Sequence, residues 1–302
     1  MANVPENFAD RLLAAIERKG SPVCVGIDPR VDRLPGELAV AAEADHARKL
    51  ARIGEFCWQV LQAVAPHVPA VKPQSAYFEA YGPAGVETYF QVVRWARELG
   101  LLVIGDVKRN DIGSTAEAYA AGHLAGPHTP DAVTVNGYFG RDGLEPFRKV
   151  CAAQGKGMFV LVRTSNPSAG QVQDFAGADG RKLYQHVAEL VASLGEGDGL
   201  VGERGYSAVG AVVAATYPDE ARELRGRMPQ QLFLVPGYGA QGATAGDCAA
   251  SFKRDGTGAI VNASRSVIYA FSRKEYADAD WRQAVAAAAG AFAQDIRNAL
   301  TR

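Results

Sequence analysis

The chain has 302 residues and a formal net charge of −1, so it lacks the strong charge excess with which proteins bind nucleic acid or a membrane surface. No apolar run approaches the roughly 20 residues of a membrane span, and the N-terminal stretch lacks the apolar core of a signal peptide. The histidines show no HxH or HExxH spacing, so we expect no zinc site. The four cysteines, which form no CxxC, predict reduced and mostly buried thiols in a cytoplasmic protein: Cys24, Cys57, Cys151 and Cys248.

Eight short apolar segments of strand length are mostly separated by segments of helical periodicity. The expected strands are 23–28, 70–74, 101–104, 132–136, 158–163, 209–213, 232–235 and 259–262. The expected helices are 7–19, 39–65, 87–99, 115–124, 144–153, 180–194, 218–227 and 281–300, with loops at 32–36 and 195–205. Strands that alternate with helices imply right-handed crossovers and a parallel sheet.

Eight such units in a chain of this length predict an α/β protein with a single (β/α)8 TIM barrel. We expect one domain over residues 1–302, with the N-terminal and C-terminal helices packed on the barrel. A doubly wound open sheet is the competing fold. It would need a GxGxxG motif after the first strand, and Gly26-Ile27-Asp28-Pro29 does not supply one.

The most informative stretch is residues 105–115, Gly-Asp-Val-Lys-Arg-Asn-Asp-Ile-Gly-Ser-Thr, at the end of the third expected strand. Asp106 and Lys108 are two residues apart, so on a strand they point to the same face. Asp111 adds a second carboxylate, and Ser114 with Glu117 predicts a capping box that begins a helix. A structural ion-pair network is one interpretation of this cluster, and a catalytic site is the other.

Other polar residues also fall at the carboxyl ends of expected strands, where barrel enzymes hold their active sites. They are Asp28, Lys72, Asn136, Thr164 with Ser165, Gln241, and Ser264 with Arg265. Together with Asp106 and Lys108 they come from seven strands and are expected to meet at one mouth. The glycine-rich segment 236–242 offers backbone N–H groups, and Arg265 offers a guanidinium fork, so this part of the mouth predicts a phosphate site.

Lys108 has a carboxylate on either side in sequence, Asp106 and Asp111, and opposite charges favour the protonated form of a lysine. A charged lysine suits proton donation, whereas Schiff-base formation wants a depressed pKa. Because the sequence has no metal motif, we expect ammonium groups alone to stabilise any developing negative charge.

These residues resemble orotidine 5′-phosphate decarboxylases of the branch with the signature Asp-x-Lys-Arg-x-Asp-Ile-x-x-Thr. The resemblance covers nearly the whole chain, and the matching segments occur in the same order. They are 25–30, 71–74, 106–115, 164–167, 236–242 and 262–265. The motif of the third strand, 106–115, is the most specific of them.

The resemblance implies a cofactor-free, metal-free homodimer that converts orotidine 5′-monophosphate to uridine 5′-monophosphate, the final step of de novo pyrimidine nucleotide biosynthesis. It implies that Lys108 gives a proton to C6 of the pyrimidine and that Asp106 lies against the departing carboxylate. The other roles it implies are these: Asp28 and Lys72 for the ribose hydroxyls and the charge chain, Asp111 and Thr115 for the neighbouring subunit's substrate, Gln241 and Arg265 for the phosphate, and Ser165 with Asn166 for the pyrimidine. Thr164 is an equally polar alternative to Ser165.

Two other functions compete with this one. A Mg²⁺-dependent sugar-phosphate decarboxylase or aldolase on a related barrel would want a further acidic residue after the second or third strand, where this chain has Lys72-Pro73-Gln74. A non-catalytic nucleotide-binding protein on a retained barrel would be expected to have lost charges from the tetrad Lys72, Asp106, Lys108 and Asp111, and all four are present.

Overall fold

The structure, a computed structural model, describes residues 5–301 and contains eight parallel strands that form a closed barrel in chain order. The strands are β1 (Val23–Ile27), β2 (Ala70–Pro73), β3 (Leu102–Arg109), β4 (Ala132–Val135), β5 (Gly157–Arg163), β6 (Ser207–Val213), β7 (Gln231–Val235) and β8 (Ala259–Ala263). β8 pairs with β1, with Asn262 opposite Cys24, and this pairing closes the sheet. The predicted (β/α)8 barrel is therefore confirmed.

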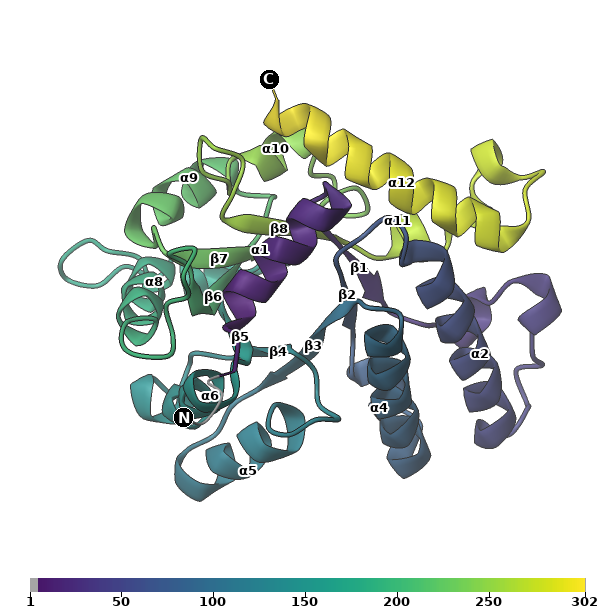
Figure 1. Ribbon diagram of the computed structural model, residues 1–302, viewed down its shortest axis with the longest axis horizontal. Coiled ribbons are helices and arrows are strands. Elements are labelled where there is room, and N and C mark those ends of the chain that lie inside the picture. Colours follow the sequence, from purple (N-terminus) through teal and green to yellow (C-terminus); the bar gives the residue numbers. More distant parts are fainter. Residues whose placement is uncertain (1–4, 302) are drawn as a thin grey trace.

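Helices surround this barrel, and short ones follow several strands (Figure 1). The α-helices are α1 (Phe8–Lys19), α2 (His46–Val64), α3 (Ala76–Glu79), α4 (Gly82–Glu98), α5 (Gly113–His123), α6 (Arg141–Gln154), α7 (Gly170–Gln173), α8 (Leu183–Leu194), α9 (Pro218–Arg227), α10 (Ala245–Ala249), α11 (Arg265–Ile268) and α12 (Trp281–Leu300). Four 3₁₀ turns accompany them, η1 (Val31–Arg33), η2 (Gly36–Leu38), η3 (Ala270–Ser272) and η4 (Lys274–Tyr276).

Helix α1 closes the amino-terminal end of the barrel (Figure 1). The Asn7 side chain caps it by accepting the Ala9 N–H at 2.8 Å, and Gly20 ends it in the left-handed conformation. Phe8 and Leu12 are buried among the side chains that fill the barrel, and burial of each contributes about 1.5–3 kcal/mol. Gly157, the first residue of β5, leaves room for the Phe8 ring, because a Cβ there would lie 2.2 Å from Phe8 Cδ1. Helix α1 therefore covers the barrel interior at this end, and a cavity opens at the other end, at the carboxyl ends of the strands.

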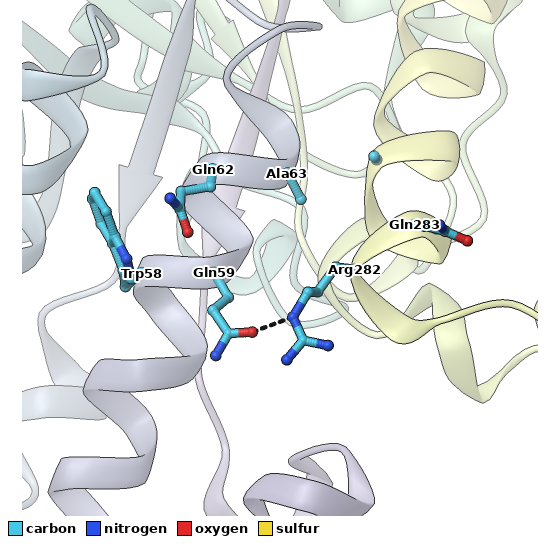
Figure 2. Close-up of a pocket in the computed structure, with 7 residues that line it drawn as sticks. Trp58, Gln59, Gln62, Ala63, Arg282 and Gln283 are labelled. Carbon is cyan, nitrogen blue, oxygen red and sulfur yellow. Dashed lines mark hydrogen bonds between the residues drawn. The ribbon is translucent and has the colours of Figure 1, made fainter.

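The C-terminal helix α12 lies on the outside of the barrel against α2 (Figure 1), where Trp281 stacks on Phe56 with ring centroids 5.5 Å apart. A hollow of about 590 Å³ lies between these helices. Figure 2 shows Trp58 and Gln59 of α2 at this hollow, with Arg282 of α12 donating a hydrogen bond to the Gln59 side chain. Its lining has no carboxylate and no nucleophile, so it does not have the chemistry of an active site.

Several helix boundaries differ from the sequence prediction. The helix predicted over 39–65 begins only at His46, because the Asp45 carboxylate caps the Arg48 N–H at 2.7 Å and the residues before it form turns. The capping box predicted at Ser114 and Glu117 is wrong. Helix α5 begins at Gly113, two residues before the predicted 115, and its capping position, Ile112, offers no side-chain hydrogen bond.

The remaining differences are small or concern short elements. The loop predicted over 32–36 is partly made of the 3₁₀ turns η1 and η2, and α4 begins five residues before the predicted 87. The helix predicted from 180 begins at Leu183, and the short helices α3, α7, α10 and α11 have no counterpart in the prediction. Helices α9 and α12 have the predicted bounds.

Candidate active site

Asp106 is the centre of the polar cluster at the carboxyl ends of the strands. It lies on β3, is 5% exposed, and accepts hydrogen bonds on both carboxylate oxygens. Oδ1 accepts from Lys108 Nζ at 2.5 Å and from Thr134 Oγ1 at 2.9 Å. Oδ2 accepts from Lys72 Nζ and, at 3.0 Å, from Gln74 Nε2. The carboxylate is therefore saturated by donors from three neighbouring strands and their ends.

The opposite charges of this cluster keep one another ionised although the side chains are buried. Burial alone would raise the pKa of Asp106, but Lys72 and Lys108 overcome that effect and hold it well below its ordinary value. Burial alone would lower the pKa of Lys72, but Asp106 and then Asp28 raise it above the ordinary value. Two ammonium groups thus face the ionised Asp106 carboxylate, with Asp28 as a second negative group on the side of Lys72.

Lys108 has an unusual backbone. Its φ of +47° is the only positive value among the non-glycine residues of the described chain, 5–301. A side chain in this region costs free energy, and such residues concentrate at functional sites. The pairing register of β3 with β4 shifts between Gly105 and Arg109, and the Lys108 N–H donates to Thr134 Oγ1 at 3.1 Å. This local irregularity turns the Lys108 side chain, which is 46% exposed, over the Asp106 carboxylate.

A cavity of about 150 Å³ opens beside these charges at the mouth of the barrel. Its lining combines the charged cluster with polar and apolar side chains from five further strands and their ends: Lys72, Asp106, Lys108, Thr134, Leu161, Thr164, Ser165, Val212, Leu234, Pro236 and Asn262. Thr164 and Ser165 both line it, whereas Asn166 is exposed and accepts a hydrogen bond from the Thr164 hydroxyl at 2.6 Å. A small site with a charged floor and apolar sides suits a planar polar ligand.

The predicted phosphate residues lie outside this cavity, at its rim. Gln241 and Arg265 are both exposed. The loop of Gln241 lies beside the end of β8, because a Cβ on Gly239 would be 3.4 Å from Ser266 Oγ. The N–H groups of Gly239 and Gly242 bond to the Ala243 and Gly239 carbonyls, so these two of the segment's N–H groups are already used within the chain. Arg265 supplies the cationic group of the predicted phosphate site.

Asp28 lies at the end of β1, half-buried, and its Oδ1 has no hydrogen-bond partner within residues 5–301. Its charge raises the pKa of Lys72, which places it on the same side of the mouth. Asn136, the last residue of the fourth predicted strand, is exposed and lies just beyond β4.

Asp111 and Thr115 are not part of the cluster within one chain. The Asp111 carboxylate accepts its own neighbour's N–H, that of Ile112, at 2.8 Å, and no ion pair of Asp111 occurs between residues 5 and 301. Thr115 is exposed on the first turn of α5. The expectation that Asp111 flanks Lys108 is therefore wrong for a single chain, because the chain turns outward after Arg109.

Three residues of the site had no predicted role. Thr134 and Gln74 both donate to Asp106, and the buried Asn262 presents to the cavity an amide whose Oδ1 has no partner in the described chain. Thr134 and Asn262 are polar residues inside otherwise apolar strands, and that interruption is the signal that could have identified them.

No group of three or more His, Cys, Asp or Glu side chains in residues 5–301 is arranged to hold a metal ion. None of the helices in this part of the chain is long and apolar enough to cross a membrane.

Comparison with known proteins gives one consistent family. The family model that matches residues 21–279 is that of the Orotidine 5'-phosphate decarboxylase / HUMPS family. An orotidine 5'-phosphate decarboxylase of Rhodopirellula baltica is 47% identical over 292 residues, which cover 93% of this chain and 96% of that protein. That of Deinococcus radiodurans is 42% identical over 263 residues, covering 87% and 89%.

The solved structures agree with the sequences. The structure of Leishmania donovani OMP decarboxylase matches with a TM-score of 0.75 and 30% identity, covering 98% of this chain and all of that one. The chain belongs to the Orotidine 5'-phosphate decarboxylase / HUMPS family.

Proposed function

We propose that this protein is a carboxy-lyase that converts orotidine 5′-monophosphate to uridine 5′-monophosphate, in pyrimidine nucleotide biosynthesis. The observation that carries the proposal is the ionised, buried Asp106 held between Lys72 and Lys108 beside a cavity at the barrel mouth. The relatives named above are orotidine 5'-phosphate decarboxylases, and they match nearly the whole chain.

In this proposal Lys108 is the proton donor. The bond between C6 of the pyrimidine and its carboxylate breaks, CO2 leaves, and the electron pair remains at C6. The Lys108 ammonium lies over the cavity floor and stabilises that charge before it gives C6 a proton. Asp106 faces the substrate carboxylate, and the repulsion between the two anions is relieved as CO2 departs.

The other contacts follow the shape of the mouth. Thr164 and Ser165 line the cavity and face the pyrimidine, and Asn166 acts on the same segment through Thr164. We place the ribose hydroxyls against Lys72 and Asp28, whose free Oδ1 is an acceptor without a protein partner in residues 5–301. A separate contact is proposed for the phosphate, which we place at the rim, against Gln241 and Arg265.

A Mg²⁺-dependent sugar-phosphate reaction, the alternative function, fits this site less well. A metal ion would need free carboxylate oxygens. Both oxygens of Asp106 already accept hydrogen bonds, each from one lysine and from one amide or hydroxyl group. The geometry therefore favours charge stabilisation by lysine.

We further propose a homodimer in which Asp111 and Thr115 reach the neighbouring active site. Three large apolar side chains are exposed near them, Ile112 at 56%, Tyr138 at 81% and Phe139 at 49%. Asp111 and Phe139 meet at Gly143, where a Cβ would lie 2.8 Å from the Asp111 carbonyl oxygen and 3.0 Å from Phe139 Cβ. A second copy of the chain would cover this apolar rim and bring its own Asp111 to the mouth.

We also propose a cytoplasmic location. Cys24, Cys57, Cys151 and Cys248 are free and buried, and such thiols are typical of proteins kept in a reducing compartment.

The test is spectroscopic. Purified protein should deplete orotidine 5′-monophosphate and form uridine 5′-monophosphate at an equal rate with and without a chelator. Turnover that disappears with the chelator and returns with Mg²⁺ would favour the alternative reaction, and no turnover in either condition would contradict the proposal.

A further inference from the structure

Arg163 is the most deeply buried charged side chain near the mouth, and no role described so far uses it. It is the last residue of β5, and its side chain is 2% exposed. A guanidinium remains charged at every accessible pH, so burying it requires compensating partners. Its neighbours are Glu220 and Tyr217 at the start of α9, and Gln173 and Asp174 at the end of α7.

The partners fix the plane of the guanidinium. Arg163 Nε lies 2.6 Å from Glu220 Oε2, and Nη2 lies 3.3 Å from Glu220 Oε1, which makes a two-pronged contact with α9. Nη2 is also 3.3 Å from Asp174 Oδ1, and the guanidinium carbon lies 3.9 Å from the centre of the Tyr217 ring. This planar fork leaves Nη1 directed at Gln173.

Gln173 connects this ion pair to the cavity. Its Oε1 accepts from Arg163 Nη1 at 3.4 Å and from the Thr164 backbone N–H at 3.1 Å. Its Nε2 donates to Thr164 Oγ1 at 2.7 Å, and that hydroxyl donates onward to Asn166 at 2.6 Å. Since Oε1 meets two donors, the amide has one orientation, and Thr164 is held through both its backbone and its side chain.

We propose that Arg163 and Gln173 are positioning residues for the pyrimidine-facing wall of the active site. The relay runs from Glu220 through Arg163 and Gln173 to Thr164, and so orients Thr164 and Ser165 toward Lys108. This inference rests on the proposed function. A buried ion pair adds little stability compared with apolar residues, so a role in fixing geometry would account for the charge buried here.

Gln173→Leu is the decisive variant, since it keeps the Arg163–Glu220 pair and removes the hydrogen bonds by which Gln173 joins Arg163 to Thr164. We expect kcat/KM for orotidine 5′-monophosphate to fall at least about 10-fold, because small misplacements of a binding wall are costly. Arg163→Lys should retain the ion pair with Glu220 but lose the contact with Gln173. We expect a comparable loss of kcat/KM and only a small change in Tm. The dissociation constant of ribose 5-phosphate, which lacks the pyrimidine, should stay within about 2-fold of the wild-type value.

The matched control is Arg225→Met. Arg225 is half-buried, and its guanidinium donates to the Met228, Gln231 and Gly258 carbonyls at the opposite end of the barrel. It should lower Tm and leave kcat/KM within about 2-fold of the wild type. The double variant Arg163→Lys with Gln173→Leu should be no worse than the poorer single variant, because both interrupt one relay.

Wild-type kcat/KM in Gln173→Leu would overturn the inference, and so would fold-losses that multiply in the double variant. A loss of ribose 5-phosphate binding equal to the loss of kcat/KM would indicate general damage and would also overturn it. The wild type is assayed alongside: if it turns over substrate while Gln173→Leu is unimpaired, only this inference fails, whereas an inactive wild type would contradict the proposed function as well.

Discussion

The two ends of the barrel both bury a carboxylate beside cations, and they do so with different results. At the mouth, Asp106 meets two lysines beside a cavity. At the closed end, Asp131, just before β4, accepts from Arg11 of α1 at 2.8 Å and from the Val103 N–H at 3.0 Å. Lys156 is buried nearby and donates to the Pro130 carbonyl at 2.8 Å and to Thr129 Oγ1 at 3.2 Å.

The difference lies in what remains unpaired. At the closed end each of these charged groups is bonded to another group of the protein, and the contacts hold α1 against the strands. At the mouth, two ammonium groups donate to one carboxylate, and Lys108 is partly exposed. The Oδ1 atoms of Asn262 and Asp28 have no hydrogen-bond partner in the described chain. Burial alone therefore does not identify a functional charge, and the informative feature is bonding capacity that is left over and faces a cavity.

The largest expected effect is the loss of Lys108. Lys108→Ala should reduce kcat by about 10²–10⁴-fold or more, because the proton donor and one of the two cations on Asp106 disappear. Its side chain is 46% exposed, so the fold should be retained, as circular dichroism and Tm can check.

The closed end supplies the control for this variant. Asp131→Asn should lower Tm while kcat/KM remains near the wild-type value, since its partners hold α1 and not the cavity. Near-native turnover by Lys108→Ala would remove this residue from the mechanism, and a large activity loss in Asp131→Asn would erase the distinction between the two ends.

The second prediction tests whether Asp111 of a neighbouring subunit contributes to the active site at the mouth. Lys108→Ala and Asp111→Ala homodimers should each be inactive. After subunit exchange in equal amounts, mixed dimers have one intact site, so activity should return to about a quarter of the wild-type value.

If Asp111 acted within its own chain, both sites of a mixed dimer would remain damaged. Failure to recover activity, with exchange verified by differently tagged subunits, would rule out the shared site. Exchange among Lys108→Ala subunits alone gives the baseline activity.

A smaller effect is expected at the rim. Arg265→Ala should weaken uridine 5′-monophosphate binding by roughly 10- to 100-fold, because a charge-assisted contact with phosphate contributes about 1.5–3 kcal/mol. Affinity for uridine, which has no phosphate, should be unaffected, and calorimetric titration measures both. Equal affinity of wild type and variant for the monophosphate would refute the placement of the phosphate.

The smallest effect concerns pH and contrasts the two buried lysines. Burial, followed by the charges of Arg97 and Arg11, lowers the pKa of Lys156 from 10.5 to about 8, although Asp131 opposes the shift. Between about pH 8 and 10.5 the unfolded chain therefore binds more protons at this lysine than the folded chain does, so its contribution to stability rises with pH. Lys72 has a raised pKa, and its contribution is fully present in this range.

The measurement is Tm for wild type and Lys156→Met between pH 7 and 10. The difference, wild type minus variant, should increase by roughly a few degrees across this window. A difference that is constant with pH would show that Lys156 does not titrate there.

Much of the fold could be predicted because its determinants are local. Helix α12 has the predicted bounds, since its apolar stripe runs from Trp281 to Leu300, and α9 begins at Pro218 as predicted. The start of α5 could not be predicted from Ser114 and Glu117. The side chains of Asn110 and Asp111 bond to the next backbone N–H groups and shape the turn, so the helix begins at Gly113.

The sequence by itself determined the alternation of strands and helices, the strand-end position of Asp106 and Lys108, and the family motif, because each is expressed within a few consecutive residues. The resemblance implied a charge chain that includes Lys72, but only the tertiary structure shows that Lys72, 34 positions before Asp106, donates to its carboxylate. It also decided that Thr134 donates to the same carboxylate and that Asp111 is turned away from Lys108 within one chain. It also joined Arg163 to Glu220, 57 positions later. Strand order and barrel closure set these distances, and a local pattern carries no information about them.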